Sequence, residues 1–310
     1  LLAGGFGMSA TSFAVTTIET NLVEYLVERG YDVWLFDYRA SINLPSARTP
    51  FTLDDIATED WPTAVDEVRS LTGAESVQAV GHCVGSATLL MALLAGMEGV
   101  RSAACSQFTT QPVTSRFNLL KATLRVGQLI QLVGLRHVSP ELQRRLPDYL
   151  LDLALRAAPM PREERCGLAV CRWISAIYGC THRHAQLNEE THQALNRLFG
   201  VGQLEAFDQI ALIMRRRRAV DHKGENVYLA HPERLAIPIH FVIGKRNYIF
   251  RPEGSDHTLR WLRAHNDPSL YTGSELDDYA HLDGLIGRDA ARDVYPGIAA
   301  HLDRTEAPRP

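Results

Sequence analysis

Residues Ser76–Ser86, which read SVQAVGHCVGS, are the most informative part of this sequence about its fold. A short buried strand pattern runs into G-x-C-x-G and then directly into the helical pattern of residues 85–94. This strand-turn-helix arrangement is typical of a nucleophile elbow, here with Cys83 at the position that serine usually takes. Gly81 and Gly85 lie two residues to either side and allow the strand and the helix to approach closely. The alternative is a buried, unreactive cysteine after a core strand.

Strand and helix patterns alternate on both sides of this elbow. Such an alternation predicts a mostly parallel sheet with helices on both faces. The strand patterns cover residues 1–4, 31–38, 76–80, 100–107, 237–244 and 269–272. The helical patterns between them cover residues 21–29, 56–71, 85–94, 255–265 and 290–302.

A long helical insertion separates the two α/β stretches. From Pro112 to about Arg234 no strand pattern recurs, and Leu-rich helical segments follow one another. Asn188 is a predicted helix N-cap within it. So long a span is not a loop, and it predicts a cap over the carboxyl edge of the sheet. The predicted division is a core of residues 1–109 and 236–303, a cap of 110–235 and a frayed tail of 304–310.

A base and its orienting residue are expected to come later in the chain than Cys83. In enzymes with a nucleophile elbow the order is nucleophile, acid, histidine. His281 lies between the last strand pattern and the last helix, which is the position of the base. Asn247 follows the strand of residues 237–244 at the position of the acid, and its side-chain oxygen can accept the imidazole N–H. Glu253 is the rival orienting residue.

Two backbone N–H groups are candidates for an oxyanion hole, which must present donors to the developing charge. Val84 follows the nucleophile directly, and Phe6 lies in the turn Gly4-Gly-Phe-Gly-Met8 after the first strand pattern. The alternative for the second segment is an ordinary glycine turn.

Composition restricts the class of protein. The chain has 310 residues, of which 45% are hydrophobic and 22% charged, which is the balance of a soluble globular protein. A net charge of −4 gives no general reason to bind nucleic acid or anionic membrane. The longest apolar run, residues 89–97, is too short to span a bilayer. Five cysteines, an odd number, indicate reduced thiols and a cytoplasmic location rather than a disulfide framework.

Three further patterns in the chain have other interpretations. Gly5-Phe-Gly-Met-Ser-Ala10 followed by Asp37 resembles a dinucleotide-binding fingerprint, and is the best candidate from another reaction class. The run Arg215–Arg218 is interpreted as a solvated helix face. The cysteines and histidines of the middle segment match no zinc-finger spacing, so packing rather than a metal is expected. They are Cys166, Cys171, Cys180, His182 and His184.

Several longer stretches give the chain a family resemblance. It resembles the α/β-hydrolase domain that follows the flavin domain in some bacterial cholesterol-oxidase-like enzymes of the glucose–methanol–choline class. More distantly, the elbow is similar to that of polyhydroxyalkanoate synthases, which carries over to Cys83 and His281. The stretches are GFGMSATSF (5–13), VWLFDYRAS (33–41), GHCVGS (81–86), LAGMEGVRSAACSQ (94–107), CGLAVCR (166–172), LNEETHQALNRLFG (187–200), VYLAHPERLAIPI (227–239) and HLDGLIGRDAARDVYPGIAAHL (281–302). Two positions depart from the pattern, Gly4 before the oxyanion turn and Ala280 before the histidine.

The resemblance implies an α/β-hydrolase fold with an inserted helical cap and acyl chemistry on an ester or thioester. The expected substrate is a small acyl or lipid molecule, with Cys83 forming the acyl-enzyme and no cofactor or metal. The chain begins at Leu1 without methionine or a basic leader, so it is expected to be a fragment, with a flavin oxidoreductase domain as the candidate upstream partner. The alternatives are a decayed accessory or docking domain of an oxidoreductase and, with less support, an NAD(P)-binding dehydrogenase.

Overall fold

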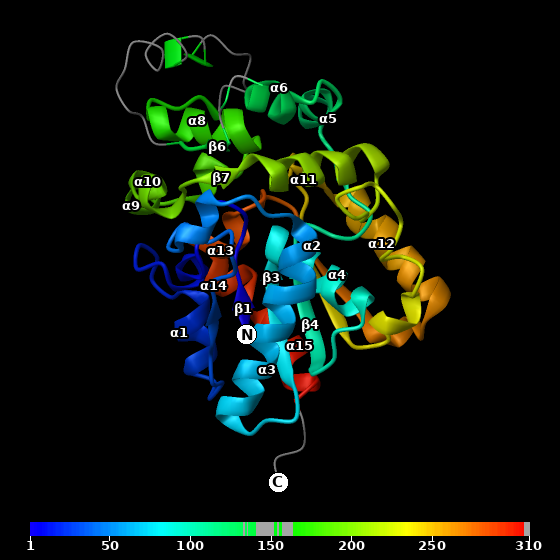
Figure 1. The fold of residues 1–310 in the computed structure, drawn as a ribbon. Coiled ribbons are helices and arrows are strands. Elements are labelled where there is room, and N and C mark those ends of the chain that lie inside the picture. The colour runs from blue at the N-terminus through cyan, green and yellow to red at the C-terminus, as the bar shows by residue number, and fades with distance from the viewer. Residues whose placement is uncertain (133, 135, 141–151, 154, 157–163, 307–310) are drawn as a thin grey trace.

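A computed structural model describes residues 1–132, 134, 136–140, 152–153, 155–156 and 164–306. Its centre is a six-stranded sheet with the order β10-β8-β4-β3-β1-β2, in which every neighbouring pair is parallel (Figure 1). The strands are β1 (Leu2–Ala3), β2 (Leu35–Phe36), β3 (Val77–His82), β4 (Val100–Ser106), β8 (Ile239–Gly244) and β10 (Tyr271–Leu276). The predicted parallel sheet is confirmed.

Both faces of the sheet are covered, because alternate strand residues belong to two different hydrophobic cores. Val77 and Ala79 of β3 pack into the core that includes residues of α3 (Trp61–Thr72) and α4 (Val84–Ala95). Val80 points to the other core, which includes residues of α1 (Leu22–Val27) and α15 (Tyr295–Arg304). Two buried faces require helices on both sides, so the doubly wound α/β arrangement is confirmed.

The helices follow the predicted order with shifted ends. They are α1 (Leu22–Val27), α2 (Leu53–Asp55), α3 (Trp61–Thr72), α4 (Val84–Ala95), α5 (Arg116–Thr123), α6 (Val126–Leu132), α8 (Ala169–Tyr178), α9 (Glu189–Gln193), α10 (Leu195–Leu198), α11 (Leu204–Arg216), α12 (Pro252–His265), α13 (Asp283–Ile286), α14 (Ala290–Asp293) and α15 (Tyr295–Arg304). The strand pattern of 31–38 is realised only over Leu35–Phe36, and the weak strand of 269–272 extends instead over Tyr271–Leu276. The helix predicted over 290–302 is divided between α14 and α15, because a proline occupies the first turn of α15.

The segment between β4 and β8 lies over the carboxyl ends of the strands, where Figure 1 shows α5, α6, α8 and α11 above the sheet. Its described residues include three two-residue strands, which corrects the expectation of a strand-free insertion: β5 (Val113–Thr114), β6 (His137–Val138) and β7 (Gly202–Gln203). β5 pairs with β9 (Phe250–Arg251), so the beginning of the insertion is bound to the second part of the core. Asn188 is the N-cap of α9, as predicted, and accepts a hydrogen bond from the Thr191 N–H at 2.7 Å.

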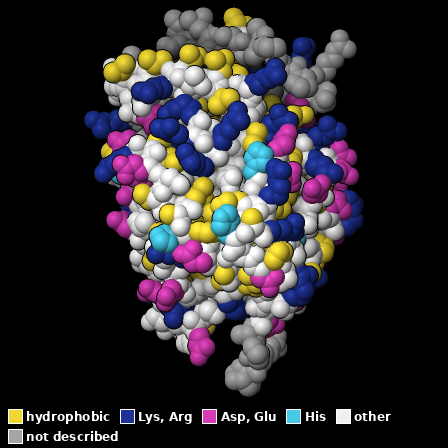
Figure 2. All heavy atoms as spheres, turned by 90° about the vertical axis from the view of Figure 1, so that its right-hand side faces the viewer, with side chains coloured by type: hydrophobic (Ala, Val, Ile, Leu, Met, Phe, Trp, Pro, Cys, Tyr) yellow, Lys and Arg dark blue, Asp and Glu magenta, His cyan; other side chains and the backbone are white. Residues whose placement is uncertain are grey.

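The cap also carries exposed apolar side chains. In Figure 2 hydrophobic atoms gather at the cap end of the molecule, and Lys and Arg side chains cluster below them. The most exposed apolar residues of this region are Phe117, Leu120, Leu124, Leu129, Leu132 and Leu153. In the described part of the chain, no helix is both long and apolar enough to cross a membrane. The tail prediction for 304–310 falls partly outside the described residues, since α15 continues to Arg304 and residues 307–310 are not described.

Candidate active site

Cys83 occupies a strained turn between β3 and α4. Its φ of 53° and ψ of −120° lie outside the regions that non-glycine residues normally adopt. The two flanking glycines are required by close packing. A Cβ on Gly81 would lie 2.6 Å from the Ser86 Cα, and one on Gly85 would lie 2.4 Å from the Ala3 carbonyl oxygen. The turn therefore has the geometry of the nucleophile elbow that the sequence predicts.

The backbone N–H groups of Phe6 and Val84 both donate hydrogen bonds to the Cys83 thiol. Burial raises the pKa of Cys83 to about 12, and the two N–H groups oppose this rise. The thiol is therefore protonated at neutral pH in the free chain. Two convergent N–H groups beside the sulfur have the arrangement of an oxyanion hole.

His281 is buried beside Asn247, but the contact uses a different atom from the one expected. The Asn247 Nδ2 lies 3.1 Å from His281 Nδ1, and it also donates to the Gln107 Oε1 at 2.9 Å. The Asn247 Oδ1 accepts the N–H groups of Ile249 and Phe250 at 3.0 and 3.1 Å. The expectation that the amide oxygen faces the ring is wrong, because two backbone donors already hold that oxygen.

This contact defines the protonation state of His281. Since Asn247 donates to Nδ1, the Nδ1 atom is unprotonated and the ring proton lies on Nε2. Burial, and to a smaller extent the neighbouring His82, hold the pKa of His281 well below its ordinary value. The resting site therefore contains a neutral thiol and a neutral imidazole. Among the hydrogen bonds of the described residues, none joins Cys83 directly to His281.

Glu253 does not contact the imidazole. It lies in the first turn of α12, half exposed, and its Oε1 pairs with Arg251 at 2.5 Å. The rival arrangement, in which Glu253 orients His281, is therefore not the one that the structure forms.

Two buried polar residues that the sequence pattern did not indicate, Gln107 and Asp283, support this site. Gln107, at a positive φ of 73°, accepts hydrogen bonds from both the Gly244 N–H and Asn247. Asp283 accepts the Ala280 N–H at 2.7 Å and the Arg183 N–H at 3.1 Å, and burial raises its pKa to about 7. Gln107 directly follows the carboxyl end of β4, and Asp283 is two residues from His281. Their positions along the chain could therefore have indicated that both lie near the site.

A third missed residue, His82, precedes the nucleophile. Its ring centroid lies 5.1 Å from that of His281, and its Nδ1 contacts the Ser106 Oγ at 3.2 Å. Burial lowers the pKa of His82 to about 3, so it is a neutral neighbour of the base.

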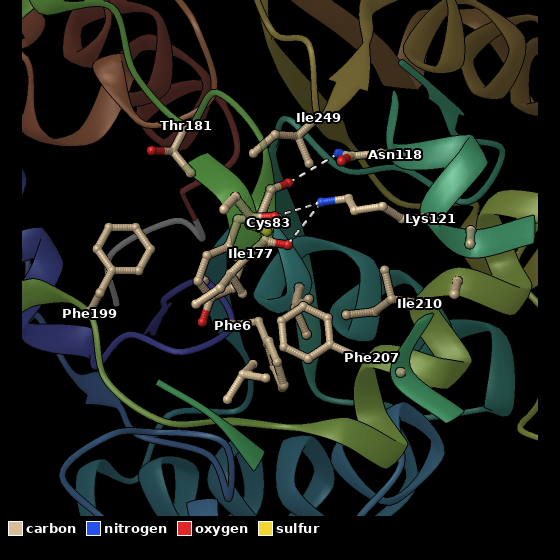
Figure 3. Close-up of a pocket in the computed structure, with 18 of the residues that line it drawn as sticks. Phe6, Cys83, Asn118, Lys121, Ile177, Thr181, Phe199, Phe207, Ile210 and Ile249 are labelled. Atoms are coloured by element: carbon tan, nitrogen blue, oxygen red, sulfur yellow. Dashed lines mark hydrogen bonds between the residues drawn. The ribbon is translucent and has the colours of Figure 1, made fainter. Parts of the chain in front are cut away.

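A cavity of about 650 Å³ opens above Cys83 and His281 and is lined by α5, α6, α8 and α11 of the cap. In Figure 3 the apolar side chains of Ile177, Phe207 and Ile210 surround the space next to Cys83. Lys121 also borders it, but donates to the Ala176 and Ile177 carbonyls, each at 3.1 Å, and burial lowers its pKa to about 8. The cavity is thus mainly apolar.

Comparisons with known proteins agree with the fold. A family profile described as alpha/beta hydrolase fold matches residues 1–122. Among solved structures, a thermophilic esterase from Thermogutta terrifontis has a TM-score of 0.54 at 14% identity, covering 99% of this chain and 89% of its own. A monoacylglycerol lipase from Paleococcus ferrophilus has a TM-score of 0.53 at 16% identity, covering 98% and 91%. The chain therefore has the α/β-hydrolase fold.

Two curated relatives match shorter regions. The poly(3-hydroxyalkanoate) polymerase subunit PhaC of Haloferax mediterranei is 33% identical over 84 residues, which are 27% of this chain and 16% of PhaC. Lipase lipl-3 of Caenorhabditis elegans is 29% identical over 94 residues, which are 27% of this chain and 23% of the lipase. The matches thus span less than a quarter of each relative.

The dinucleotide-binding interpretation does not fit this structure. The turn after β1 leads into the 3₁₀ helix Ala10–Ala14 rather than an α-helix, so it offers no α-helical N-terminus to a pyrophosphate. The Asp37 carboxylate accepts the Ala10 N–H at 2.7 Å, which ties it to the turn itself.

Proposed function

We propose that this chain acts on an ester or thioester of an acyl or lipid molecule, with Cys83 as the nucleophile. The observation that carries the proposal is the Cys83 elbow, whose sulfur faces the N–H groups of Phe6 and Val84 at the floor of an apolar cavity. An acyl carbonyl bound there would have its carbon beside the sulfur. Its oxygen would face two donors that need no reorganisation.

In the proposed reaction, Cys83 Sγ attacks the carbonyl carbon while its proton passes to His281 Nε2. The leaving alkoxide or thiolate then takes this proton, and water or another acceptor resolves the acyl-enzyme. His281 can accept at Nε2 only when its own proton is on Nδ1. Asn247 then has to present its oxygen, which requires the amide to rotate away from the Ile249 and Phe250 N–H groups. We infer that this rotation accompanies substrate binding, and that Asn247 is a positioning residue.

The cap favours an apolar acyl chain. Ile177, Phe207 and Ile210 present apolar side chains to the part of the cavity next to Cys83. The charged residues Lys121, Arg125 and Asp208 also line the cavity. The likeness of a short region to a polyhydroxyalkanoate polymerase subunit and to a lipase supports the same substrate class. Acyl transfer and hydrolysis differ only in the acceptor that resolves the acyl-enzyme.

The test is intact mass spectrometry after incubation with activated esters of increasing acyl length. The chain should gain the mass of one acyl group, with a preference for apolar chains, and Cys83→Ala should gain none. Cys180→Ala is the matched control, because Cys180 is not among the residues lining the cavity. Incubation of the acylated chain in buffer alone, or in buffer with a thiol or alcohol acceptor, then distinguishes hydrolysis from acyl transfer. If no ester acylates the chain, or if Cys83→Ala is acylated as readily as the wild-type chain, the assignment of Cys83 as the nucleophile is wrong.

A further inference from the structure

A second group of cysteines and histidines lies in the cap. The Sγ atoms of Cys166 and Cys171 and one ring nitrogen each of His184 and His192 lie within 4.8 Å of one another. We propose that these four side chains bind one Zn²⁺ ion as a structural site. The spacing C-x4-C-x12-H-x7-H matches no zinc-finger pattern, and His192 lay outside the residues that the sequence brought together. The folded chain nevertheless brings the four donor atoms together.

The donor distances approach those of a zinc tetrahedron. Zn–S and Zn–N bonds of about 2.3 and 2.0–2.1 Å place a sulfur and a nitrogen about 3.6 Å apart, and two sulfurs about 3.8 Å apart. Cys166 Sγ lies 3.3 Å from His192 Nε2, and Cys171 Sγ lies 3.5 Å from His184 Nε2. The donor atoms that lie farthest apart, at up to 4.8 Å, would have to move about 1 Å closer together when the ion binds.

The surrounding hydrogen bonds orient the ligands. The Glu164 carboxylate lies 2.8 Å from His184 Nδ1, so Nδ1 keeps its proton and the Nε2 lone pair faces Cys171. A carboxylate behind a ligating histidine is a recurrent outer partner of zinc sites. The Leu168 N–H donates to Cys166 Sγ at 3.3 Å, which favours the thiolate that a metal requires.

The donor set identifies the metal and the kind of site. Two thiolates and two imidazoles suit zinc and exclude magnesium and calcium, which prefer oxygen ligands. Four protein ligands leave no open position for water, so the site is structural rather than catalytic. His182 Nε2 also lies 3.5 Å from Cys171 Sγ, but His182 does not belong to the group of four, and neither does Cys180.

The site would join three segments of the cap to the catalytic base. Cys166 lies just before α8 and Cys171 in its first turn, His184 lies in the 3₁₀ helix His184–Gln186, and His192 lies in α9. The residues just before His184 hold the loop of His281: the Leu282 N–H donates to the Thr181 carbonyl at 2.7 Å, and the Arg183 N–H donates to Asp283. A metal ion would therefore brace the base from the cap side.

The experiment measures metal binding and does not depend on the proposed function. The chain, purified without an affinity tag under reducing conditions and depleted with a chelator, is titrated with Zn²⁺ against a chromophoric competitor and, separately, with Co²⁺. About one equivalent of each ion should bind, and Co²⁺ should show the intense absorption of a four-coordinate thiolate complex. His192→Asn and Cys166→Ser should each weaken zinc binding by more than about 100-fold.

The controls are Cys180→Ser, a cysteine of the same segment outside the group, and His257→Asn, an exposed histidine of α12. Both should keep stoichiometric binding. Because His192 is only partly buried, its variant should fold, which circular dichroism verifies. The proposal is overturned if the depleted wild-type chain takes up no zinc, if His192→Asn binds as tightly as wild type, or if Cys166 and Cys171 form a disulfide under these conditions.

Discussion

The core and the cap each place a cysteine beside a histidine, but a different group orients each histidine. In the core, the amide nitrogen of Asn247 donates to Nδ1 of His281. In the cap, the carboxylate of Glu164 accepts from Nδ1 of His184. The first arrangement leaves the ring proton on Nε2, whereas the second leaves Nε2 free to bind a metal. The core histidine can therefore accept a proton at Nε2 only after the Asn247 amide has rotated, whereas the cap histidine already presents a free Nε2 lone pair to a metal ion.

The largest expected effect is that of replacing the core cysteine, Cys83. Cys83→Ala should lower turnover of an activated ester by at least about 10³-fold, because it removes the nucleophile, while leaving zinc content unchanged. Steady-state kinetics and metal analysis on the same preparation measure both. A Cys83→Ala chain that retains wild-type turnover would remove the basis for assigning catalysis to the core pair.

Glu164→Gln gives the cap histidine an uncharged orienting partner like that of the core. Since Glu164 contacts His184 Nδ1 and not the metal position, zinc affinity should fall by about 10–100-fold rather than vanish. Competition titration measures the change, with Glu189→Gln, an exposed first-turn residue of α9, as the control. Unchanged affinity would show that the carboxylate is not an outer partner of a metal.

Gly85→Ala tests whether backbone packing alone sets the position of the core cysteine. An added methyl group would meet the Ala3 carbonyl oxygen at 2.4 Å, so the free energy of unfolding should fall by roughly 1–3 kcal/mol. Gly167→Ala is the control, because nothing lies within 4 Å of its Cβ position. Chemical denaturation compares the two, and equal stabilities would contradict the close approach of strand and helix.

Asn247→Asp gives the core histidine a carboxylate like that of the cap. An adjacent anion favours the imidazolium, so the pKa of His281 should rise from its depressed value. Because His281 accepts a proton only when neutral, the acid limb of kcat/KM should move to higher pH. Asn247→Ala, which offers no partner, should slow acylation without this upward shift. An acid limb that stays in place in Asn247→Asp would separate Asn247 from the base.

The smallest effect is expected at Glu253. Its surface pair with Arg251 contributes little, so Glu253→Ala should change stability by less than about 0.5 kcal/mol and leave the pH profile of acylation unaltered. A displaced acid limb would show that Glu253 reaches His281 during catalysis.

Much of the core was determined by sequence alone. The apolar strand before Gly81, the glycines flanking Cys83 and the helix after it depend on neighbours in the chain, so local pattern was enough to predict the elbow. The order of nucleophile and histidine along the chain likewise indicated His281, because strand order in a parallel sheet brings the loops at strand ends together.

The atoms that meet in each site depend on how distant parts of the chain pack together. Which side of the Asn247 amide faces His281 depends on backbone donors at Ile249 and Phe250 and on Gln107, a residue 140 positions away in the chain. The association of Cys166 and Cys171 with His192 likewise depends on how short helices of the cap fold back on one another. Side-chain hydrogen bonds are directional and short-ranged. The sequence therefore shows which donors and acceptors are present, whereas packing determines which of them come within 3.5 Å of one another.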